Sequence, residues 1–496
     1  MGQPFIHPTG VTIYDPEKAY NGYTVLHAPK LGTVLIDMNG NVVRVWKDLH
    51  GFPNKLLPGG YVMGSRGRRN VKYGYQDQVD LVQVDWEGNI VWCFDKKEYI
   101  EDPGEEPRWM ARQHHDYQRE GNPVGYYVPG MDPKVDSGNT LILCHENLYN
   151  HKISDKLLLD DVFIEVDWEG NIIWEWRCSD HFSEYGFSEA ARNALFRNPN
   201  MHESGGGMGD WMHINSMSYL GPNKWYDAGD ERFHPENIIW DGREANYIAI
   251  ISKKTGKVVW SLGPDYTATK EERRIGQIIG QHHVHMIPKG LPGEGNILIF
   301  DNGGWSGYGV PSNTSRDGTK VNIMDRSRVI ELDPITKKVV WELKGSDLFG
   351  YGLPGINDYR FYSPLTSSAQ RLPNGNTFIT EGVGGRFFEV TPDKEVVWEF
   401  ISPFTENPGT IYYRAYRYPY SYVPQLPEPN EIPVPKLDIR TFRVPGAAPC
   451  TVENVVEVPG TLGYQDVTQA CVAAADQDLS LREDEDDDDP VTYTKF

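Results

Sequence analysis

Histidine is concentrated in three short stretches of the chain. They read RQHHDYQ (Arg112–Gln118), DWMHINSMSY (Asp210–Tyr219) and GQHHVHMIPKG (Gly280–Gly290). A neutral imidazole can bind a transition metal, or it can act as an acid, a base or a nucleophile near neutral pH. A single histidine in a strand is most often a polar residue bonded to a neighbouring loop. Three stretches that meet in space would instead predict a functional site.

One arginine helps to distinguish a metal site from an anion site. Arg243, in IIWDGREANY, lies at the end of the strand that follows the one carrying His213. A metal pocket rarely tolerates a permanent cation, whereas an oxyanion pocket needs one, because guanidinium offers a planar fork of donors. The combination favours a tetrahedral oxyanion, such as a sulfate or phosphate ester. If a metal is bound instead, the expected ligands are His115, His213 and His283.

A motif that occurs six times indicates which elements hold these stretches. Each copy is an apolar strand, a tight turn and a second strand that ends in an aromatic residue, as a β-hairpin requires. The copies are GTVLIDMNGNVVRVW from Gly32, DLVQVDWEGNIVWCF from Asp80, VFIEVDWEGNIIWEW from Val162, YIAIISKKTGKVVWSL from Tyr247, RVIELDPITKKVVWEL from Arg328 and RFFEVTPDKEVVWEF from Arg386. The Trp of each hairpin is expected to pack between neighbouring sheets.

Glycine-punctuated strands such as SGNTLILCHE (Ser137–Glu146) precede most of the hairpins, which gives about four strands per unit. Four-stranded repeats of this kind predict an all-β fold, a six-bladed β-propeller with long inter-blade loops. The strand before each glycine-punctuated strand should line the channel. This places the histidine stretches on inner strands of blades two, four and five. Strand alternation turns His282 away from His283 and His285, and separates His114 from His115 in the same way.

Composition limits the partners and the compartment. The chain has 496 residues and a net charge of −22, so its surface repels nucleic acid and anionic membranes. It has no apolar run long enough to span a membrane and no secretory signal at its start. The five cysteines are scattered, which favours a cytoplasmic location. We expect a propeller over residues 1–422, then a proline-rich extension and an acidic, disordered tail over residues 423–496. The sequence makes no prediction of oligomeric state.

The chain resembles the bacterial arylsulfate sulfotransferases over roughly residues 110–415. The matching stretches are DWMHINSMSY, QHHVHMIPKG with GNILIFDNG, SRVIELD, FYSPLTS and YYRA. The resemblance implies a six-bladed propeller that moves a sulfuryl group from a phenolic sulfate to a phenol. It implies that His282 becomes transiently sulfated, with His213, Arg243 and His115 as the other catalytic residues. The chain lacks the GxxxxGK[ST] loop of nucleotide-dependent enzymes, in agreement with a phenolic donor.

The expected partners are small aromatic substrates, with neither nucleic acid nor a membrane. No cofactor is expected; the alternative is a transition metal on the channel histidines. The chain departs from the resemblance where DGRE replaces SSRH, which sets Glu244 beside Arg243. Another enzyme (a hydrolase, a lyase or a histidine–metal enzyme) and a non-catalytic binding propeller therefore stay open. The residues expected to contact the substrate are Trp211, Asn215, His283, Asp301, Asn302 and Tyr413.

Overall fold

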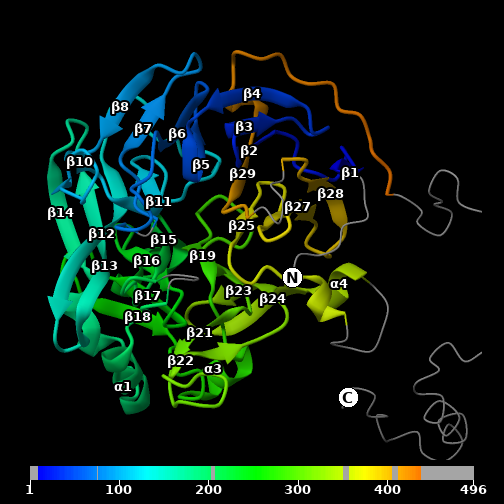
Figure 1. Cartoon of the computed structure of the whole chain (residues 1–496). Helices are drawn as coiled ribbons and strands as arrows, with labels where there is room; N and C mark the ends of the chain where they lie inside the picture. Colours follow the sequence, from blue (N-terminus) through cyan, green and yellow to red (C-terminus); the bar gives the residue numbers. More distant parts are fainter. Residues whose placement is uncertain (1–8, 75, 203–206, 350–356, 405–410, 437–496) are drawn as a thin grey trace, which may run out of the picture. The chain divides into compact units, whose positions relative to one another are not determined.

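The computed structural model describes residues 9–74, 76–202, 207–349, 357–404 and 411–436. Six antiparallel sheets form a ring in the view of Figure 1. From the inner strand outward, blades one to three are β29 (Ala415–Tyr418), β2 (Tyr23–Ala28), β3 (Gly32–Ile36) and β4 (Val42–Lys47); β5 (His50–Leu57), β6 (Tyr61–Ser65), β7 (Leu81–Val84) and β8 (Ile90–Phe94); and β11 (Gln113–Arg119), β12 (Thr140–Asn150), β13 (Ser154–Val166) and β14 (Ile172–Arg177).

Blades four to six follow the same plan. They are β15 (Ile214–Tyr219), β16 (Ile238–Gly242), β17 (Tyr247–Ile251) and β18 (Val258–Leu262); β19 (His282–Met286), β20 (Ile297–Asp301), β23 (Arg328–Asp333) and β24 (Lys338–Lys344); and β25 (Ser367–Arg371), β26 (Thr377–Glu381), β27 (Arg386–Val390) and β28 (Val396–Ile401). The six inner strands contact one another in a closed circle. The predicted all-β, six-bladed propeller is therefore confirmed.

One blade assignment was wrong. The stretch Arg112–Gln118 was placed in blade two, but it forms β11, the inner strand of blade three. The error arose because a hairpin of β9 (Glu98–Ile100) and β10 (Arg108–Met110) precedes β11, and a long connection separates β11 from β12. The three histidine stretches therefore lie on consecutive blades, which brings them closer together than the sequence assignment implied.

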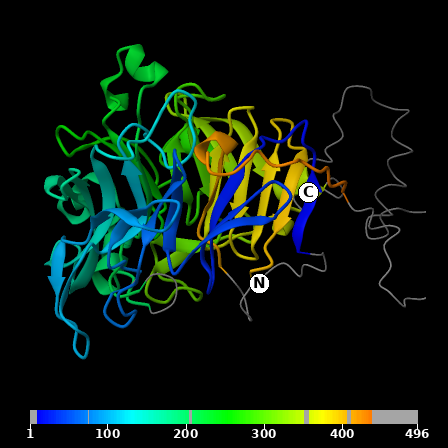
Figure 2. The same ribbon diagram turned by 90° about the horizontal axis from the view of Figure 1, so that it is seen from above.

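Both ends of the described chain close the ring. The inner strand of blade one, β29, comes from the C-terminal side, and β1 (Gly10–Tyr14) pairs with β28 at the outer edge of blade six. Figure 2 shows β1, in blue, beside the yellow strands of that blade. Tyr14 also exchanges two backbone hydrogen bonds with Val434, of 2.8 and 2.9 Å. The compact unit extends to Lys436 and so includes the first residues of the proline-rich extension, and the acidic run lies outside the described residues.

A tryptophan from each blade is bonded to the next blade. In every case the indole Nε1 donates to a backbone carbonyl in the hairpin turn of the following blade, and the series closes from blade six to blade one. The bonds are Trp46 to Asp85 at 3.2 Å, Trp92 to Trp168 at 2.9 Å, Trp176 to Gly256 at 2.8 Å, Trp260 to Pro334 at 2.9 Å, Trp341 to Pro392 at 2.9 Å and Trp398 to Met38 at 2.8 Å. The repeated Trp of the sequence thus joins neighbouring sheets, where its amphipathic ring suits an apolar seam with one polar partner.

Insertions interrupt the regular plan on several blades. A hairpin of β21 (Trp305–Tyr308) and β22 (Thr319–Ile323) separates β20 from β23 in blade five. The short helices are η1 (Cys178–Glu184), α1 (Glu189–Arg197), α2 (Lys224–Asp227), η2 (Glu231–Phe233), α3 (Lys270–Ile275), α4 (Gly345–Phe349), η3 (Asp358–Arg360) and η4 (Tyr420–Tyr422). None of the helices among the described residues is long and apolar enough to span a membrane.

Candidate active site

Blades three, four and five each have a histidine in the left-handed backbone region near the start of the inner strand. The φ angles are +51° at His115, +52° at His213 and +52° at His283. The ladder between each inner strand and its neighbour shifts register at this point. A bulge of this kind redirects a side chain that regular alternation would point elsewhere. It accounts for the convergence of side chains from three different blades.

Three of the predicted catalytic histidines gather around two aromatic rings. The rings of His115 and His213 lie 4.7 Å apart between centroids. Tyr413 packs edge-on against His115 at 5.3 Å and against His282 at 6.4 Å. Phe52 stacks on Tyr413 at 4.4 Å and also contacts His115 at 4.4 Å. The structure thus brings together residues from four blades and from the segment before β29.

His282 is held in one orientation by Asn302. The Nδ1 atom of His282 lies 2.8 Å from Oδ1 of Asn302 and 3.1 Å from the carbonyl of Gly280. Asn302 is itself oriented, because its Nδ2 donates to the carbonyl of Ser363 and its Oδ1 accepts from Ser367 at 3.1 Å. Two acceptors face Nδ1 of His282, so that atom carries the proton and Nε2 keeps a lone pair. This arrangement suits a nucleophilic or metal-binding Nε2.

Arg243 lies beside the histidines and is also paired with Glu244. Its backbone N–H donates to the carbonyl of His213 at 3.1 Å, which fixes the turn after β16. Its guanidinium bonds Oε1 of Glu244 and donates to the carbonyl of Trp305 at 3.4 Å. Both side chains of the pair are buried. The carboxylate expected from DGRE therefore takes up part of the donor fork but leaves the cation close to His282.

A second buried arginine was not among the predicted site residues. Arg414 donates to the hydroxyl of Tyr413 at 2.9 Å and forms an ion pair of 2.8 Å with Asp116. Asp116 is also paired with Lys55, at 2.7 Å. Arg414 lies within the YYRA stretch, so the residue types did carry a signal, but only Tyr413 was taken from it. The structure thus adds a second buried cation, next to Tyr413, which the sequence predicted to contact the substrate.

Burial keeps the three histidines of β19 neutral. Desolvation, followed by the nearby Arg243, lowers the pKa of His282 well below its usual value. Desolvation, followed by Arg414, does the same to the pKa of His283, and burial lowers the pKa of His285 to about 4. Charging an imidazole in a dry site beside a guanidinium is costly, and the neutral form therefore dominates at neutral pH. These imidazoles need not lose a proton before they donate a lone pair.

His213 has an acidic partner of its own. Its Nδ1 lies 2.5 Å from Oδ2 of Asp210. An imidazole that donates from Nδ1 to a carboxylate is fixed in one tautomer and can shuttle a proton through Nε2. The pair therefore suits general acid–base work beside the nucleophile candidate.

Several predicted substrate contacts have other partners in the structure. Trp211 is fully buried in the core between blades, and its indole donates to Asp160 at 3.0 Å. Asp301 binds Arg328 at 2.9 Å and caps the backbone N–H of Ile279 at 2.9 Å, so it holds the chain just before β19. Asn302 orients His282, as described above. The polar atoms of Trp211 and Asp301 thus bond to other parts of the protein. These two residues support the site and are not placed to contact a substrate.

The remaining two predicted contacts differ from each other. Asn215 lies next to Tyr413. Its carbonyl accepts from the Tyr413 hydroxyl at 2.5 Å, and its side chain donates to the carbonyl of Gln281 at 2.9 Å. The ring of His283 instead packs against that of His285, with 4.5 Å between the centroids. His283 is directed at the Tyr416 hydroxyl, 3.4 Å away. His283 therefore contacts Tyr416 and His285, whereas His282 contacts Tyr413.

The metal set expected from the sequence is not assembled. Among the described residues, His115, His213 and His283 do not form a group with ligand spacing. The group that does have such spacing is His114, His145 and Asp161, and His114 is the residue before His115 in the sequence. The sequence analysis missed it because His145 and Asp161 lie on middle strands of blade three rather than on the channel strand.

A cavity of about 450 Å³ lies away from the histidines. It is bordered by residues at the C-terminal ends of β11, β15 and β17, including Glu120, Tyr219 and Lys253, whereas His115 and His213 lie near the N-terminal ends of β11 and β15. The histidines themselves are 2–5% exposed, and Phe52 is more accessible than they are. The candidate site is therefore a closed, polar cluster, and the Phe52 ring beside it is more accessible than its histidines.

Comparison with known proteins gives one family. The family model described as Arylsulfotransferase (ASST) matches residues 133–403. No curated protein shows a significant sequence match. The similar solved structures include a protein of unknown function from Bacteroides caccae (11% identity, TM-score 0.40, 79% of this chain and 98% of that chain), a streptogramin B lyase (10%, 0.34, 82% and 86%) and virginiamycin B lyase from Staphylococcus aureus (10%, 0.32, 80% and 84%). At these TM-scores the likenesses bear on neither the fold nor the reaction.

Proposed function

The chain belongs to the arylsulfotransferase family, and from that premise we propose that it moves a sulfuryl group from a phenolic sulfate ester to a phenol through a sulfated His282. The observation that carries this proposal is the fixed orientation of His282. Asn302 holds Nδ1 at 2.8 Å, so Nε2 offers its lone pair within the layer that contains His115, His213 and Tyr413. A covalent intermediate divides the transfer into two steps with lower barriers.

In the first step, Nε2 of His282 attacks sulfur. The N–S bond forms as the bond between sulfur and the aryl oxygen breaks, and the electron pair leaves with the phenolate. Protonated His213, whose Nδ1 is bonded to Asp210, gives a proton from Nε2 to that phenolate. In the second step, an acceptor phenol returns a proton to His213 and its oxygen attacks sulfur. The N–S bond breaks, and His282 is regenerated in its starting form.

Two cations supply electrostatic stabilisation. The charge of Arg243 acts on His282, and Arg414 lies under Tyr413 with its guanidinium carbon 4.8 Å from the ring centroid. Charge that develops on the sulfuryl oxygens and on the leaving phenolate is strongly stabilised by fixed cations in a dry site. Glu244 draws on part of the Arg243 fork, which favours a sulfate ester, with one negative charge, over a phosphate monoester with two.

Substrate entry requires a side chain to move. The histidines are almost fully enclosed, and Phe52 stacks on Tyr413 and packs at a tilt against His115. We propose that the aromatic ring of the ester displaces Phe52 and takes over its stacking contacts. A phenyl group can replace a phenylalanine ring at little cost in buried apolar area, because the two are similar in size.

The decisive experiment is an assay with 4-nitrophenyl sulfate in the presence and absence of phenol. We expect nitrophenolate release that depends on phenol, and a mass increase of one sulfuryl group on His282 when the acceptor is omitted. His282→Asn should abolish both signals. His285→Gln, on the same strand but directed at Tyr126, is the matched control and should retain both.

Other outcomes would point to different functions. Release that does not need phenol would identify a hydrolase. Unchanged release by His282→Asn would overturn the proposed nucleophile. No release with any aryl sulfate, together with tight binding of such an ester, would favour a binding propeller.

A further inference from the structure

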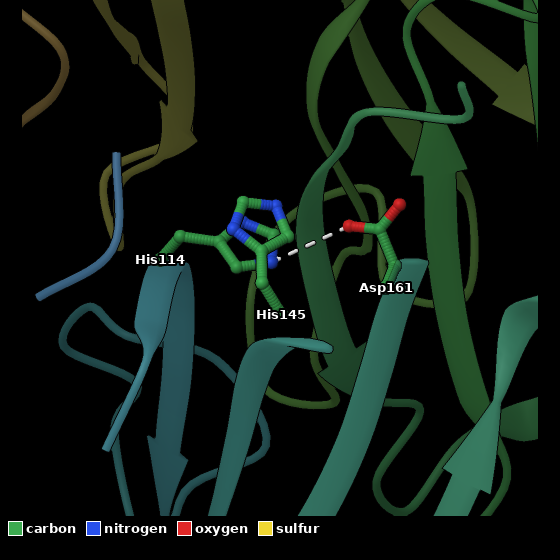
Figure 3. A group of neighbouring side chains, drawn as sticks. All are labelled: His114, His145 and Asp161. Carbon is green, nitrogen blue, oxygen red and sulfur yellow. Dashed lines mark ion pairs between the residues drawn. The ribbon is translucent and has the colours of Figure 1, made fainter. Parts of the chain in front are cut away.

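Three buried side chains of blade three point toward one another beside the candidate active site. His114 lies on β11, His145 on β12 and Asp161 on β13, and His145 and Asp161 are directly paired across the ladder. Figure 3 shows the two imidazole rings overlapping, with the Asp161 carboxylate directed at them. We propose that His114, His145 and Asp161 form a binding site for one divalent transition-metal ion of the zinc type.

The spacing of the donor atoms fits such an ion. Nε2 of His114 lies 3.4 Å from Oδ1 of Asp161, and the donor atoms of all three residues lie within 4.8 Å of one another. Tetrahedral ligands 2.0–2.1 Å from zinc are separated by about 3.4 Å. Two imidazole nitrogens and one carboxylate oxygen are donors that zinc accepts, with a fourth position left for water or another group.

The Nε2 atoms of the two histidines, His114 and His145, have no hydrogen-bond partner among the described residues. All three side chains are fully buried. A buried polar atom without a partner costs about 1–3 kcal/mol. An ion bound between these two nitrogens and Asp161 would remove that cost for both. The unpartnered atoms are an observation independent of the ligand spacing.

The other nitrogen of each ring is held as a metal ligand requires. Nδ1 of His145 lies 2.6 Å from Asp77, which is fixed in turn by Arg112 at 2.8 Å. A carboxylate on Nδ1 keeps the proton there and directs the Nε2 lone pair at the metal. Nδ1 of His114 lies 2.8 Å from Nδ1 of His115. A metal on Nε2 of His114 would place the shared proton on His114 Nδ1, so that His115 accepts it and carries its own proton on Nε2.

Local charge also favours a cation. Asp161 has no Lys or Arg partner in the ion pairs of the described residues, and the carboxylates of Asp210, Asp160 and Asp241 act on it electrostatically. A divalent ion would offset this concentration of buried acids. The imidazole rings stack at 3.5 Å with an angle of 13° between their planes, so ligation requires them to tilt apart at their Nε2 edges.

The test measures metal directly and does not depend on the proposed sulfuryl transfer. The full chain, without an affinity tag, is purified from zinc-containing medium and its metal content is determined by mass spectrometry. We expect about one equivalent of zinc per chain, as a three-residue site predicts. His145→Gln and Asp161→Asn should each lose it. His151→Gln, which alters an exposed His–Asp pair, is the matched control and should keep it.

A cobalt titration of the unaltered chain answers the question even if the variants fail to fold. We expect the intense visible absorption of four-coordinate Co²⁺, saturating at one equivalent and removed by added zinc. Metal-free protein whose spectrum stays that of hydrated Co²⁺ would overturn the proposal. So would a full equivalent of zinc in the folded His145→Gln variant.

Discussion

Blades three to five and blades six and one use the same four-stranded plan for different purposes. In blades three to five, a left-handed histidine and a shift in register lie near the start of each inner strand. In blades six and one, the inner strands β25 and β29 pair without a shift and contain no left-handed residue. Blades three to five, which we call the irregular half, supply the histidines of the candidate site and Arg243. Blades six and one, which we call the regular half although they are only two blades, close the ring and contribute Tyr413 and Arg414 only from the segment before β29.

The comparison shows how a nearly symmetric ring acquires a one-sided site. A non-glycine residue in the left-handed region costs on the order of 1–3 kcal/mol, and it persists only where its surroundings enforce it. The inner strands of blades six and one have no such cost, and buried charges of these blades are held in ion pairs such as Arg386 with Glu381 and Glu399. On the proposed function, the same residue types serve reaction chemistry in blades three to five and stability in blades six and one, and equivalent substitutions should separate the two.

The largest expected difference comes from removing a buried arginine in each half. Arg243→Met and Arg386→Met both leave buried carboxylates without their cation, so both should destabilise the fold, by roughly 3–5 kcal/mol. Only Arg243→Met should also lower kcat for aryl sulfate turnover, by about 100- to 1000-fold, because a fixed donor at the developing charge is lost. Turnover per folded molecule and urea unfolding measure the two effects.

The outcome that would break the comparison is a similar fall in kcat for the folded fraction of both variants. Arginine would then act through overall rigidity rather than through its place beside His282. Restoration of activity to Arg243→Met by added guanidinium, without any effect on Arg386→Met, would sharpen the assignment.

An asparagine in each half gives the next largest difference. Asn302→Leu removes the acceptor on His282 Nδ1, so the ring can rotate or change tautomer, and kcat should fall by about 10- to 100-fold with little change in KM. Asn376→Leu removes a 2.7 Å bond to buried Glu389 and should instead cost about 1–3 kcal/mol of unfolding free energy. If Asn302→Leu altered stability alone, Asn302 would be a structural residue like Asn376.

The sequence was sufficient to predict the architecture because the fold is built from a local sequence pattern that repeats. Six hairpin motifs with positive-φ turn residues, such as Gly40 at +81° and Gly170 at +86°, give the blades and their number. The Trp at the end of each motif predicts the contacts between sheets. In the fifth and sixth turns, Lys337 and Lys394 adopt the positive φ that glycine provides elsewhere, so the pattern survives a change of residue.

The site was less accessible to sequence reasoning because it depends on contacts between distant blades. Arg414 forms an ion pair with Asp116, 298 residues away in the sequence, and no local sequence pattern at either residue predicts this pair. The left-handed backbone at His115 and His283 breaks the period of two on which side-chain directions were based. Periodicity could therefore locate the histidine stretches, but not the neighbours of His114 or the role of Asn302.

A smaller effect should follow the protonation of buried histidines. The pKa of His285 in blade five and that of His27 in blade one are both lowered to about 4, chiefly by desolvation. The unfolded state takes up these protons near pH 6.5, so the unfolding free energy falls as the pH drops from about 6.5 toward 4. At pH 5.5 the buried His285 should cost about 1.4 kcal/mol relative to pH 8.

Variants at the two positions test whether this effect is shared by the halves. His285→Gln and His27→Gln should each flatten the acid slope of stability, measured by urea unfolding between pH 8 and pH 5. The slope should be reduced less for His27→Gln, because His27 is only partly enclosed and solvent screens its charge. A steeper slope in either variant would contradict a neutral buried imidazole.

The smallest expected effect concerns the tryptophan bonds that join neighbouring blades. Trp398→Phe removes the bond from blade six to Met38 of blade one, and Trp176→Phe removes the one from blade three to Gly256 of blade four. Each substitution keeps a buried aromatic ring and loses one hydrogen bond, so each should cost about 1 kcal/mol of unfolding free energy. Near-equal losses by urea unfolding would mean that the seam closed by the chain ends is as strong as a junction between consecutive blades. A clearly larger loss for Trp398→Phe would show instead that the contact between blades six and one depends more on its tryptophan bond than the contact between blades three and four does.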